Sequence, residues 1–244
     1  MRKAALTAHD SWSSGPPSVG PMFDRIAPTY DLLNHLLSLG RDYAWRRRVT
    51  QQLRGQEVPH IIDLATGTGD LLISLLRGCP TLLKATGLDI SQRMLAVCRE
   101  KLRTRGLTER VDLVCADASA TPFSAGAFDA ATMAFGIRNT PSAVATLAEI
   151  HRILKPGGVA LILEFSLPAQ RVVRWCYLKY LRSAVPWLGA AISGDRHAYR
   201  YLDESIEAFY RPETFAALMR ETGFCAVSAI PLTWGVASIY KGTK

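Results

Sequence analysis

A glycine-containing loop between two carboxylates is the first feature of the chain that could form a ligand-binding site. Asp63 and Asp70 bracket Gly67 and Gly69, directly after a short apolar segment and before a helical pattern. Glycines at such a place let the backbone approach a ligand closely. Leu72 replaces the third glycine of a dinucleotide motif, and the two acids would repel a pyrophosphate. The loop therefore favours a cofactor without phosphate and with a positive centre, such as S-adenosylmethionine.

Two further acids follow the next two apolar segments and complete a nucleoside-binding pattern. Asp89 stands where an acid binds ribose hydroxyls in such folds, and one carboxylate accepts from both hydroxyls. Asp117 is followed by Ala118, so a carboxylate and a backbone N–H are available to an adenine ring. The loop and the two acids, each at a predicted strand end, indicate one binding site.

The elements that must position these residues alternate between strands and helices. Such alternation predicts an α/β fold with a mostly parallel sheet and helices on both faces. We expect strands at 60–64, 85–88, 111–115, 128–135 and 159–163, helices from 70, over 91–106 and over 142–154, and two closing strands at 224–231 and 236–240.

The segments before and after these five strands do not show the alternation of strands and helices. Residues 1–21 are rich in Ser, Pro and Gly and predict a disordered tail, followed by a single domain over 22–244. Within that domain, residues 22–55 predict an N-terminal helical cap interrupted at Pro28. Residues 169–211 predict a helical and loop insertion beside the substrate, with an amphipathic helix over 169–192 that is broken at Pro186.

Composition bounds the class of protein. The 244 residues are 48% hydrophobic and carry a net charge of +8, which suits a folded domain with an anionic partner. The five cysteines are widely spaced and lack zinc-ligand spacing, so we predict free thiols in a reducing compartment and no metal. Because no apolar run approaches about 20 residues, we expect a cytoplasmic protein.

In these motifs the sequence resembles a known family, the menaquinone and ubiquinone biosynthesis C-methyltransferases. They are class I S-adenosylmethionine-dependent enzymes. The resemblance covers roughly residues 20–242. Two runs are the most specific, and several others are shared more widely among methyltransferases. The specific runs are Met22–Asp31 and Phe135–Asn139; the others include 45–47, 63–70, 87–91, 154–158, 163–166 and 199–206.

The resemblance implies a Rossmann-like class I methyltransferase fold with seven strands, of which a terminal one is antiparallel. It also implies the residues that contact the cofactor. They are Thr68, Asp89, Asp117 and Ala118. From the residues themselves we add Asp63, Gly67 and Gly69 of the glycine loop, and Tyr30, which either closes over the cofactor or packs in the core. Ala134 is also placed at the cofactor, although family members often have a serine there.

The implied reaction is C-methylation of a prenylated quinol, with demethylmenaquinol as the preferred substrate. We predict that Arg138 stabilises a developing phenolate and that Asn139 orients a hydroxyl or water. A benzoquinol precursor of ubiquinone is the first alternative. An RNA methyltransferase, an NAD-dependent oxidoreductase and a non-catalytic cofactor-binding module are weaker alternatives. The quinone head group, the tail length, the proton acceptor and homo-oligomerisation stay open.

The positive charge gathers in two segments. Residues 41–55 carry five Arg and one Asp, and residues 171–200 carry six basic residues and one acid. Because a prenylated substrate resides in a membrane, we expect peripheral association with the inner face of an anionic membrane and no nucleic-acid partner. Simple packing of 169–192 on the sheet is the alternative.

Overall fold

The computed structural model describes residues 20–27, 29–193 and 203–244. The predicted tail lies outside the described residues except for its last two positions, which begin the first helix. The division into tail, cap and insertion stays a prediction.

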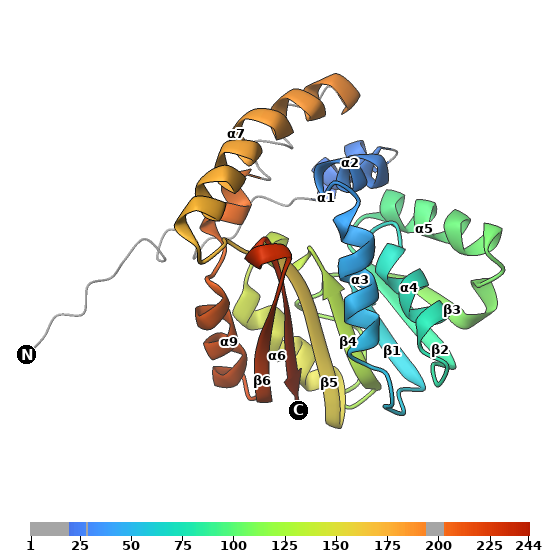
Figure 1. Ribbon diagram of the computed structural model, residues 1–244. Helices are drawn as coiled ribbons and strands as arrows, with labels where there is room; N and C mark the ends of the chain where they lie inside the picture. Colours follow the sequence, from blue (N-terminus) through green and yellow to red (C-terminus); the bar gives the residue numbers. More distant parts are fainter. Residues whose placement is uncertain (1–19, 28, 194–202) are drawn as a thin grey trace, which may run out of the picture.

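One seven-stranded sheet forms the centre of the molecule (Figure 1). Its order is β3-β2-β1-β4-β5-β7-β6, and β7 runs in the opposite direction to the other six strands. The mostly parallel sheet with a late antiparallel strand confirms the predicted fold. The strands are β1 (His60–Leu64), β2 (Lys84–Asp89), β3 (Val111–Cys115), β4 (Phe128–Ala134), β5 (Leu154–Phe165), β6 (Cys225–Leu232) and β7 (Ala237–Thr243).

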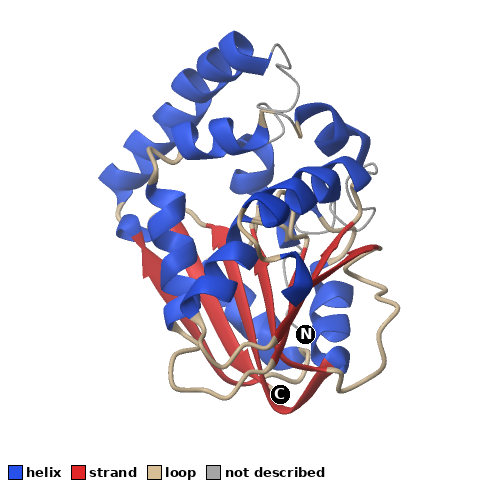
Figure 2. Ribbon diagram, turned by 90° about the vertical axis from the view of Figure 1, so that its right-hand side faces the viewer, coloured by secondary structure: helices blue, strands red, loops and turns tan. Residues whose placement is uncertain are grey.

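Helices cover both faces of this sheet, as Figure 2 shows from the side. They are α1 (Gly20–Ile26), α2 (Tyr30–Leu37), α3 (Arg41–Gln51), α4 (Asp70–Gly78), α5 (Gln92–Thr104), α6 (Ala143–Ile153), α7 (Arg171–Ser193) and α9 (Pro212–Glu221). Successive strand residues point to opposite faces. Ile61 thus packs in one apolar core with α3, α4 and α5, while Ile62 packs in the other with α6 and α9.

The strand order reverses between β1 and β4, and this reversal locates the binding crevice. β1 pairs in parallel with β2 on one side and with β4 on the other. The connections that follow β1 and β4 therefore diverge, which opens a crevice at the carboxyl ends of the strands. The loop after β1 and the acid that ends β2 both reach this edge.

Helix starts follow from local sequence, as expected. The Ser91 hydroxyl accepts the backbone N–H of Met94 at 3.1 Å and caps α5, which confirms the predicted cap. Ser142 caps α6 in the same way through Ala145. These hydroxyls satisfy N–H groups that have no partner inside the helix.

Two local features differ from expectation. The predicted turn at 155–158 is a bulge inside β5, where Leu154 pairs with Phe128 and Val159 already pairs with Ala130. The predicted break at Pro186 is wrong, because α7 runs continuously from Arg171 to Ser193. A proline inside a helix removes one hydrogen bond, and a long helix can absorb that loss by bending.

Glu149 on α6 ties the loop after β3 to the core. Its Oε1 accepts from the backbone N and hydroxyl of Thr121 at 2.8 and 2.5 Å and from Arg152 at 2.7 Å. The hydrogen bond from Arg152, with those from Thr121, lowers the pKa of Glu149 to about 2. A carboxyl group with a lowered pKa stabilises the fold above its ordinary pKa near 4.5, and the contribution is lost as pH falls towards 2.

We therefore predict that Glu149→Gln destabilises the protein by about 2 kcal/mol at pH 7. The difference from wild type should shrink between pH 5 and pH 3. Urea unfolding at several pH values measures both. Glu100→Gln, which removes an exposed partner of Arg103, is the matched control and should leave stability unchanged. A constant deficit of Glu149→Gln across pH would contradict the assignment.

Candidate active site

A cavity of about 210 Å³ lies at the carboxyl ends of β1, β2 and β4, beneath α1 and α2. Most of the residues predicted to bind the cofactor line it. They are Tyr30, Gly67, Asp89, Asp117, Ala118 and Ala134, and Asn139 lines it as well.

The loop after β1 owes its shape to two glycines in the left-handed region. Gly67 has φ 57° and Gly69 has φ 86°. A Cβ on Gly69 would lie 2.5 Å from the Cys98 sulfur, so this glycine serves the packing of α5 against the loop. Gly67 lines the cavity and donates its backbone N–H to Asp89 Oδ2 at 2.8 Å.

The two acids predicted to bind a nucleoside are held in place by backbone amides. Asp89 is 8% exposed, and Oδ1 accepts from Ser91 N at 2.8 Å while Oδ2 accepts from Gly67. Burial raises the pKa of Asp89. Asp117 Oδ1 accepts from the Ser119 N and hydroxyl, both at 2.7 Å. Each carboxylate still has lone pairs for a ligand, so both residues fit ribose and adenine contacts.

Three predicted cofactor residues do not line the cavity: Asp63, Thr68 and Gly69. Asp63 is 1% exposed and accepts from Thr66 at 2.7 Å and from Thr132 at 2.6 Å. Burial raises the pKa of Asp63 to about 6. Its two contacts join the loop after β1 to β4, so this acid supports the cavity from beneath.

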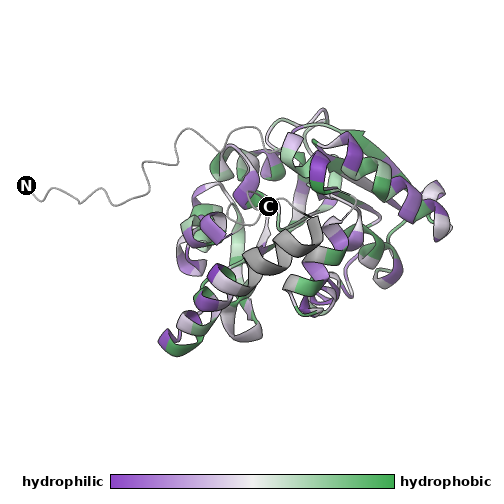
Figure 3. Ribbon diagram, turned by 90° about the horizontal axis from the view of Figure 1, so that it is seen from above, coloured by the Kyte–Doolittle hydropathy of each residue, from purple (hydrophilic) through white to green (hydrophobic). Residues whose placement is uncertain are grey.

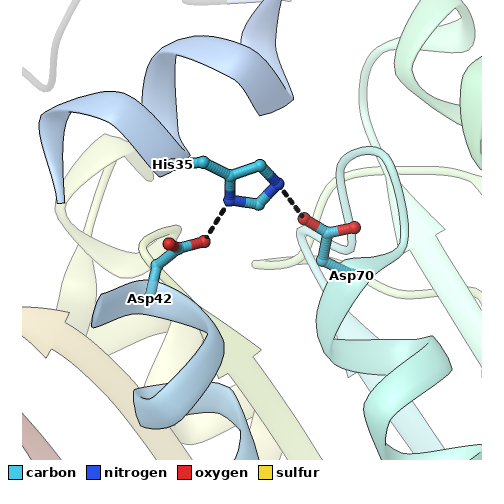
Figure 4. A group of neighbouring side chains, drawn as sticks. All are labelled: His35, Asp42 and Asp70. Atoms are coloured by element: carbon cyan, nitrogen blue, oxygen red, sulfur yellow. Dashed lines mark hydrogen bonds and ion pairs between the residues drawn. The ribbon is translucent and has the colours of Figure 1, made fainter. Parts of the chain in front are cut away.

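Thr68 belongs to a charge network that fastens α2 to the core. Its hydroxyl donates to Asp31 at 2.5 Å, and Lys101 of α5 contacts Asp31 at 2.9 Å and also pairs with Asp70. His35 Nδ1 lies 2.7 Å from Asp42 Oδ2, and its Nε2 lies 3.7 Å from Asp70 Oδ2 (Figure 4).

The oxygen and nitrogen atoms of His35, Asp42 and Asp70 lie within 4.8 Å of one another. Such a group resembles a cation site, but each carboxylate already has a cationic partner. Arg46 pairs with Asp42 and Lys101 pairs with Asp70. The network therefore acts as a set of salt bridges between α2, α3, α4 and α5.

Helices α1 and α2 each bring one aromatic ring to the cavity. Phe23 and Tyr30 meet edge to face with ring centroids 6.1 Å apart, and both line the cavity. Burial raises the pKa of Tyr30, so its hydroxyl stays neutral. Phe23 and Met94 also line the cavity, although neither is predicted from the sequence as a site residue.

The loops after β1 and β4 approach each other closely at this edge. Ala65 and Phe135 both have positive φ values, 49° and 56°, and both line the cavity. A Cβ on Gly136 would lie 2.6 Å from the Ala65 Cβ, so only glycine fits there. Backbone strain of this kind is typical of functional loops.

Arg138 follows in the same turn and is buried. Its Nη1 donates to Glu164 Oε1 at 2.5 Å and to the Phe135 carbonyl at 2.8 Å, and its Cζ lies 5.3 Å from the centre of the Phe165 ring. Glu164 on β5 is 0% exposed, and burial raises its pKa. Sequence reasoning missed Glu164 as the partner of Arg138, although it stands in a run shared with the family.

The turn that carries Arg138 separates two cavities. Asn139 lines the first, where its amide donates to the Phe135 carbonyl at 3.1 Å. Arg138 lines a second cavity of about 180 Å³. Thr140 and Pro141 line both, so the two cavities are neighbours across one turn.

Comparison with known proteins identifies the family to which this chain belongs. A model of the ubiE/COQ5 methyltransferase family matches residues 12–244. A demethylmenaquinone methyltransferase of Thermus thermophilus is 46% identical over 223 residues, which cover 91% of this chain and 100% of that protein. The chain belongs to the ubiE/COQ5 methyltransferase family.

This family membership confirms the resemblance drawn from the sequence, and it makes the protein a methyltransferase. A ubiquinone/menaquinone biosynthesis C-methyltransferase of Geotalea uraniireducens is 40% identical and covers 91% of this chain and 94% of its own length. The crystal structure of a SAM-dependent methyltransferase from Thermotoga maritima has a TM-score of 0.64 at 19% identity, over 92% of this chain and 99% of its own. That likeness shows the shared fold.

The raised pKa of Asp63 predicts that cofactor binding by this ubiE/COQ5 family member depends on pH. S-adenosylmethionine carries a sulfonium charge that S-adenosylhomocysteine lacks, so ionisation of acids around the cavity favours the former. As pH falls through about 6, Asp63 becomes neutral. We expect the preference for S-adenosylmethionine over S-adenosylhomocysteine to fall by about five- to tenfold between pH 8 and pH 5.

Calorimetric titration with both ligands measures this preference, and Asp63→Asn should flatten its pH dependence. The same variant should unfold at a higher temperature than wild type at pH 8. A buried carboxyl group with a raised pKa favours folding below its ordinary pKa, and that contribution is lost as pH rises through about 6. An unchanged pH profile in Asp63→Asn would refute the role of this acid.

Proposed function

We propose that this protein transfers the methyl group of S-adenosylmethionine to a ring carbon of a prenylated quinol, with demethylmenaquinol as the substrate. The observation that carries the proposal is the pair of neighbouring cavities on the two sides of the Phe135–Asn139 turn. One holds the acids suited to a nucleoside, and the other presents a buried arginine. The relatives named as quinone methyltransferases support this substrate class.

The residues of the first cavity fit S-adenosylmethionine. Asp89 would accept from the ribose hydroxyls, and Asp117 with the Ala118 N–H would hold the adenine edge. Tyr30 and Phe23 would cover the nucleoside with neutral aromatic surface. The cofactor supplies an electrophilic methyl group, and the protein supplies alignment and exclusion of water.

In the reaction, a ring carbon of the quinol would attack the methyl carbon, the carbon–sulfur bond would break to leave S-adenosylhomocysteine, and the ring carbon would then lose its proton to water. The attack is faster once a ring hydroxyl becomes more phenolate-like. Arg138 stabilises that negative charge, and the Glu164 contact fixes the direction of the guanidinium. Asn139 orients a hydroxyl or a water from the other side of the turn.

We further propose that α7 brings the protein to the membrane that holds its substrate. Val172 is 75% exposed and Trp175 is 63% exposed on a helix that also carries Arg171, Arg174 and Arg182. Figure 3 shows hydrophilic and hydrophobic residues interspersed along the described part of this helix. Aromatic and apolar residues flanked by arginines are suited to an anionic lipid surface.

No helix in the described part of the chain combines the length and the apolar character needed to cross a membrane.

The reaction is tested by transfer of labelled methyl from S-adenosylmethionine in detergent. We expect transfer to demethylmenaquinol, slower transfer to a demethylated benzoquinol and none to tRNA. Arg138→Gln combined with Glu164→Gln, which avoids a lone buried charge, should lower turnover by at least about 100-fold with unchanged cofactor affinity. Faster transfer to the benzoquinol would move the substrate to ubiquinone precursors, and transfer to tRNA alone would refute the proposal.

The membrane role predicts that charge removal weakens binding to vesicles. Arg171→Gln with Arg174→Gln should weaken binding to vesicles containing anionic lipid, measured by co-sedimentation, by about 30-fold, because each basic residue near the surface contributes about 1 kcal/mol. Cofactor affinity should not change. Arg103→Gln with Arg105→Gln removes the same charge from the exposed end of α5 and is the control. Binding that does not depend on anionic lipid would contradict this role.

A further inference from the structure

Four buried side-chain atoms in the described part of the chain have no hydrogen-bond partner. They are Arg138 Nε, Tyr177 Oη, Asp203 Oδ1 and Tyr240 Oη. Tyr240 lies in the core beside α9, away from the cavities. Buried polar atoms without partners are rare and cost about 1–3 kcal/mol each, so a cluster of them calls for a ligand.

The other three atoms come from segments that meet at one place. Residues 203–208 are helical and pack against α7 and the end of β5, where Ile206, Leu181 and Phe165 share an apolar cluster with Tyr177. Arg182 of α7 contacts Glu207 at 2.8 Å and fastens the two helices together. Tyr177 and Asp203 are thereby brought close to each other.

Arg138 reaches the same region from the turn after β4. Its guanidinium lies over the Phe165 ring, which packs against the cluster that contains Tyr177. Arg138 and Ser205 line the same second cavity. Tyr177 and Asp203 are not among the lining residues of that cavity, but the charges of Arg138, Glu164 and Asp203 all affect the pKa of the Tyr177 hydroxyl, which places the four groups near one another.

The three unpartnered atoms differ in hydrogen-bonding character. The Nε–H of Arg138 can only donate, and the Tyr177 hydroxyl stays protonated because burial raises its pKa. Burial and the nearby Glu207 raise the pKa of the Asp203 carboxyl; in its ionised form this group can only accept. A phenolic hydroxyl donates one hydrogen bond and accepts two, so two donors and one acceptor match it.

We propose that Arg138 Nε, Tyr177 and Asp203 form the subsite for one ring hydroxyl of the substrate, and that Asp203 thereby selects the reduced quinol over the oxidised quinone. This inference rests on the proposed function and deepens it. A quinone carbonyl has no hydrogen to donate, so its oxygen would face the Asp203 oxygen without a bond. Only the quinol is a carbon nucleophile, so the selection keeps the inactive oxidised form out of the site.

The test compares the KM for demethylmenaquinol with the inhibition constant of the oxidised demethylmenaquinone, at pH 8 without oxygen. Wild type should favour the quinol by at least about tenfold. Asp203→Asn, whose amide can donate to a carbonyl, should bring the two constants within about threefold of each other. Tyr177→Phe should raise both by about five- to tenfold, because it removes a donor that serves either form.

Matched substitutions on the same helices are the controls. Tyr180→Phe removes a hydroxyl one turn along α7, and Glu204→Gln removes a charge next to Asp203. Neither should change the ratio of the two constants, and no variant should change the affinity for S-adenosylmethionine. A general structural defect would alter turnover and cofactor affinity without a specific change in the ratio.

An unchanged ratio in Asp203→Asn, or an equal change in Glu204→Gln, would overturn the inference. Unchanged constants in Tyr177→Phe would remove the tyrosine from the subsite and overturn it as well. Failure of the wild-type protein to methylate any quinol would instead show that the proposed function is wrong. Active wild type with unaffected variants would leave the function standing and reject the subsite alone.

Discussion

The reversal of strand order between β1 and β4 is the constraint on which the whole site depends. Because β1 has a parallel neighbour on each side, the chain leaves the carboxyl edge in two directions and cannot fill the gap between them. Asp89, Asp117, Arg138 and Asn139 are all brought to that edge. The strained turns at Ala65 and Phe135 exist because the two loops must pass each other there, with Gly136 at the closest approach.

The second level of organisation is electrostatic. On one side, salt bridges of Asp31, Asp70 and Lys101 hold α2 above the nucleoside cavity. On the other, Glu164 holds Arg138 at the wall of the second cavity. Both arrangements place charge in a poorly hydrated region, where removal of one partner costs more than the pair contributes to stability. Their value is in fixing geometry around the two cavities.

Sequence reasoning was most successful where local pattern decides structure. The strand at 60–64, the cap at Ser91 and the cavity-lining acids at Asp89 and Asp117 all follow from short-range rules and from the alternation of strands and helices. Contacts between distant segments were out of reach. Pairing of Arg138 with Glu164 joins residues 26 positions apart, and nothing in either local pattern signals it.

The role of Asp63 illustrates the same limit. A carboxylate beside a glycine loop indicates ligand contact, but the turn directs it towards Thr66 and Thr132 beneath the cavity. The helix α7 likewise runs through Pro186, although proline is a local helix-breaking signal.

The central claim is that one turn divides a nucleoside cavity from a quinol cavity and aligns their contents. A crystal structure with S-adenosylhomocysteine and a non-reactive menaquinol analogue tests it most directly. We predict ribose hydroxyls on Asp89 and the quinol ring beside Arg138, with a ring carbon in direct line with the sulfur where the two cavities meet at Thr140 and Pro141. A ring bound outside the second cavity, with no path to the sulfur, would contradict the account.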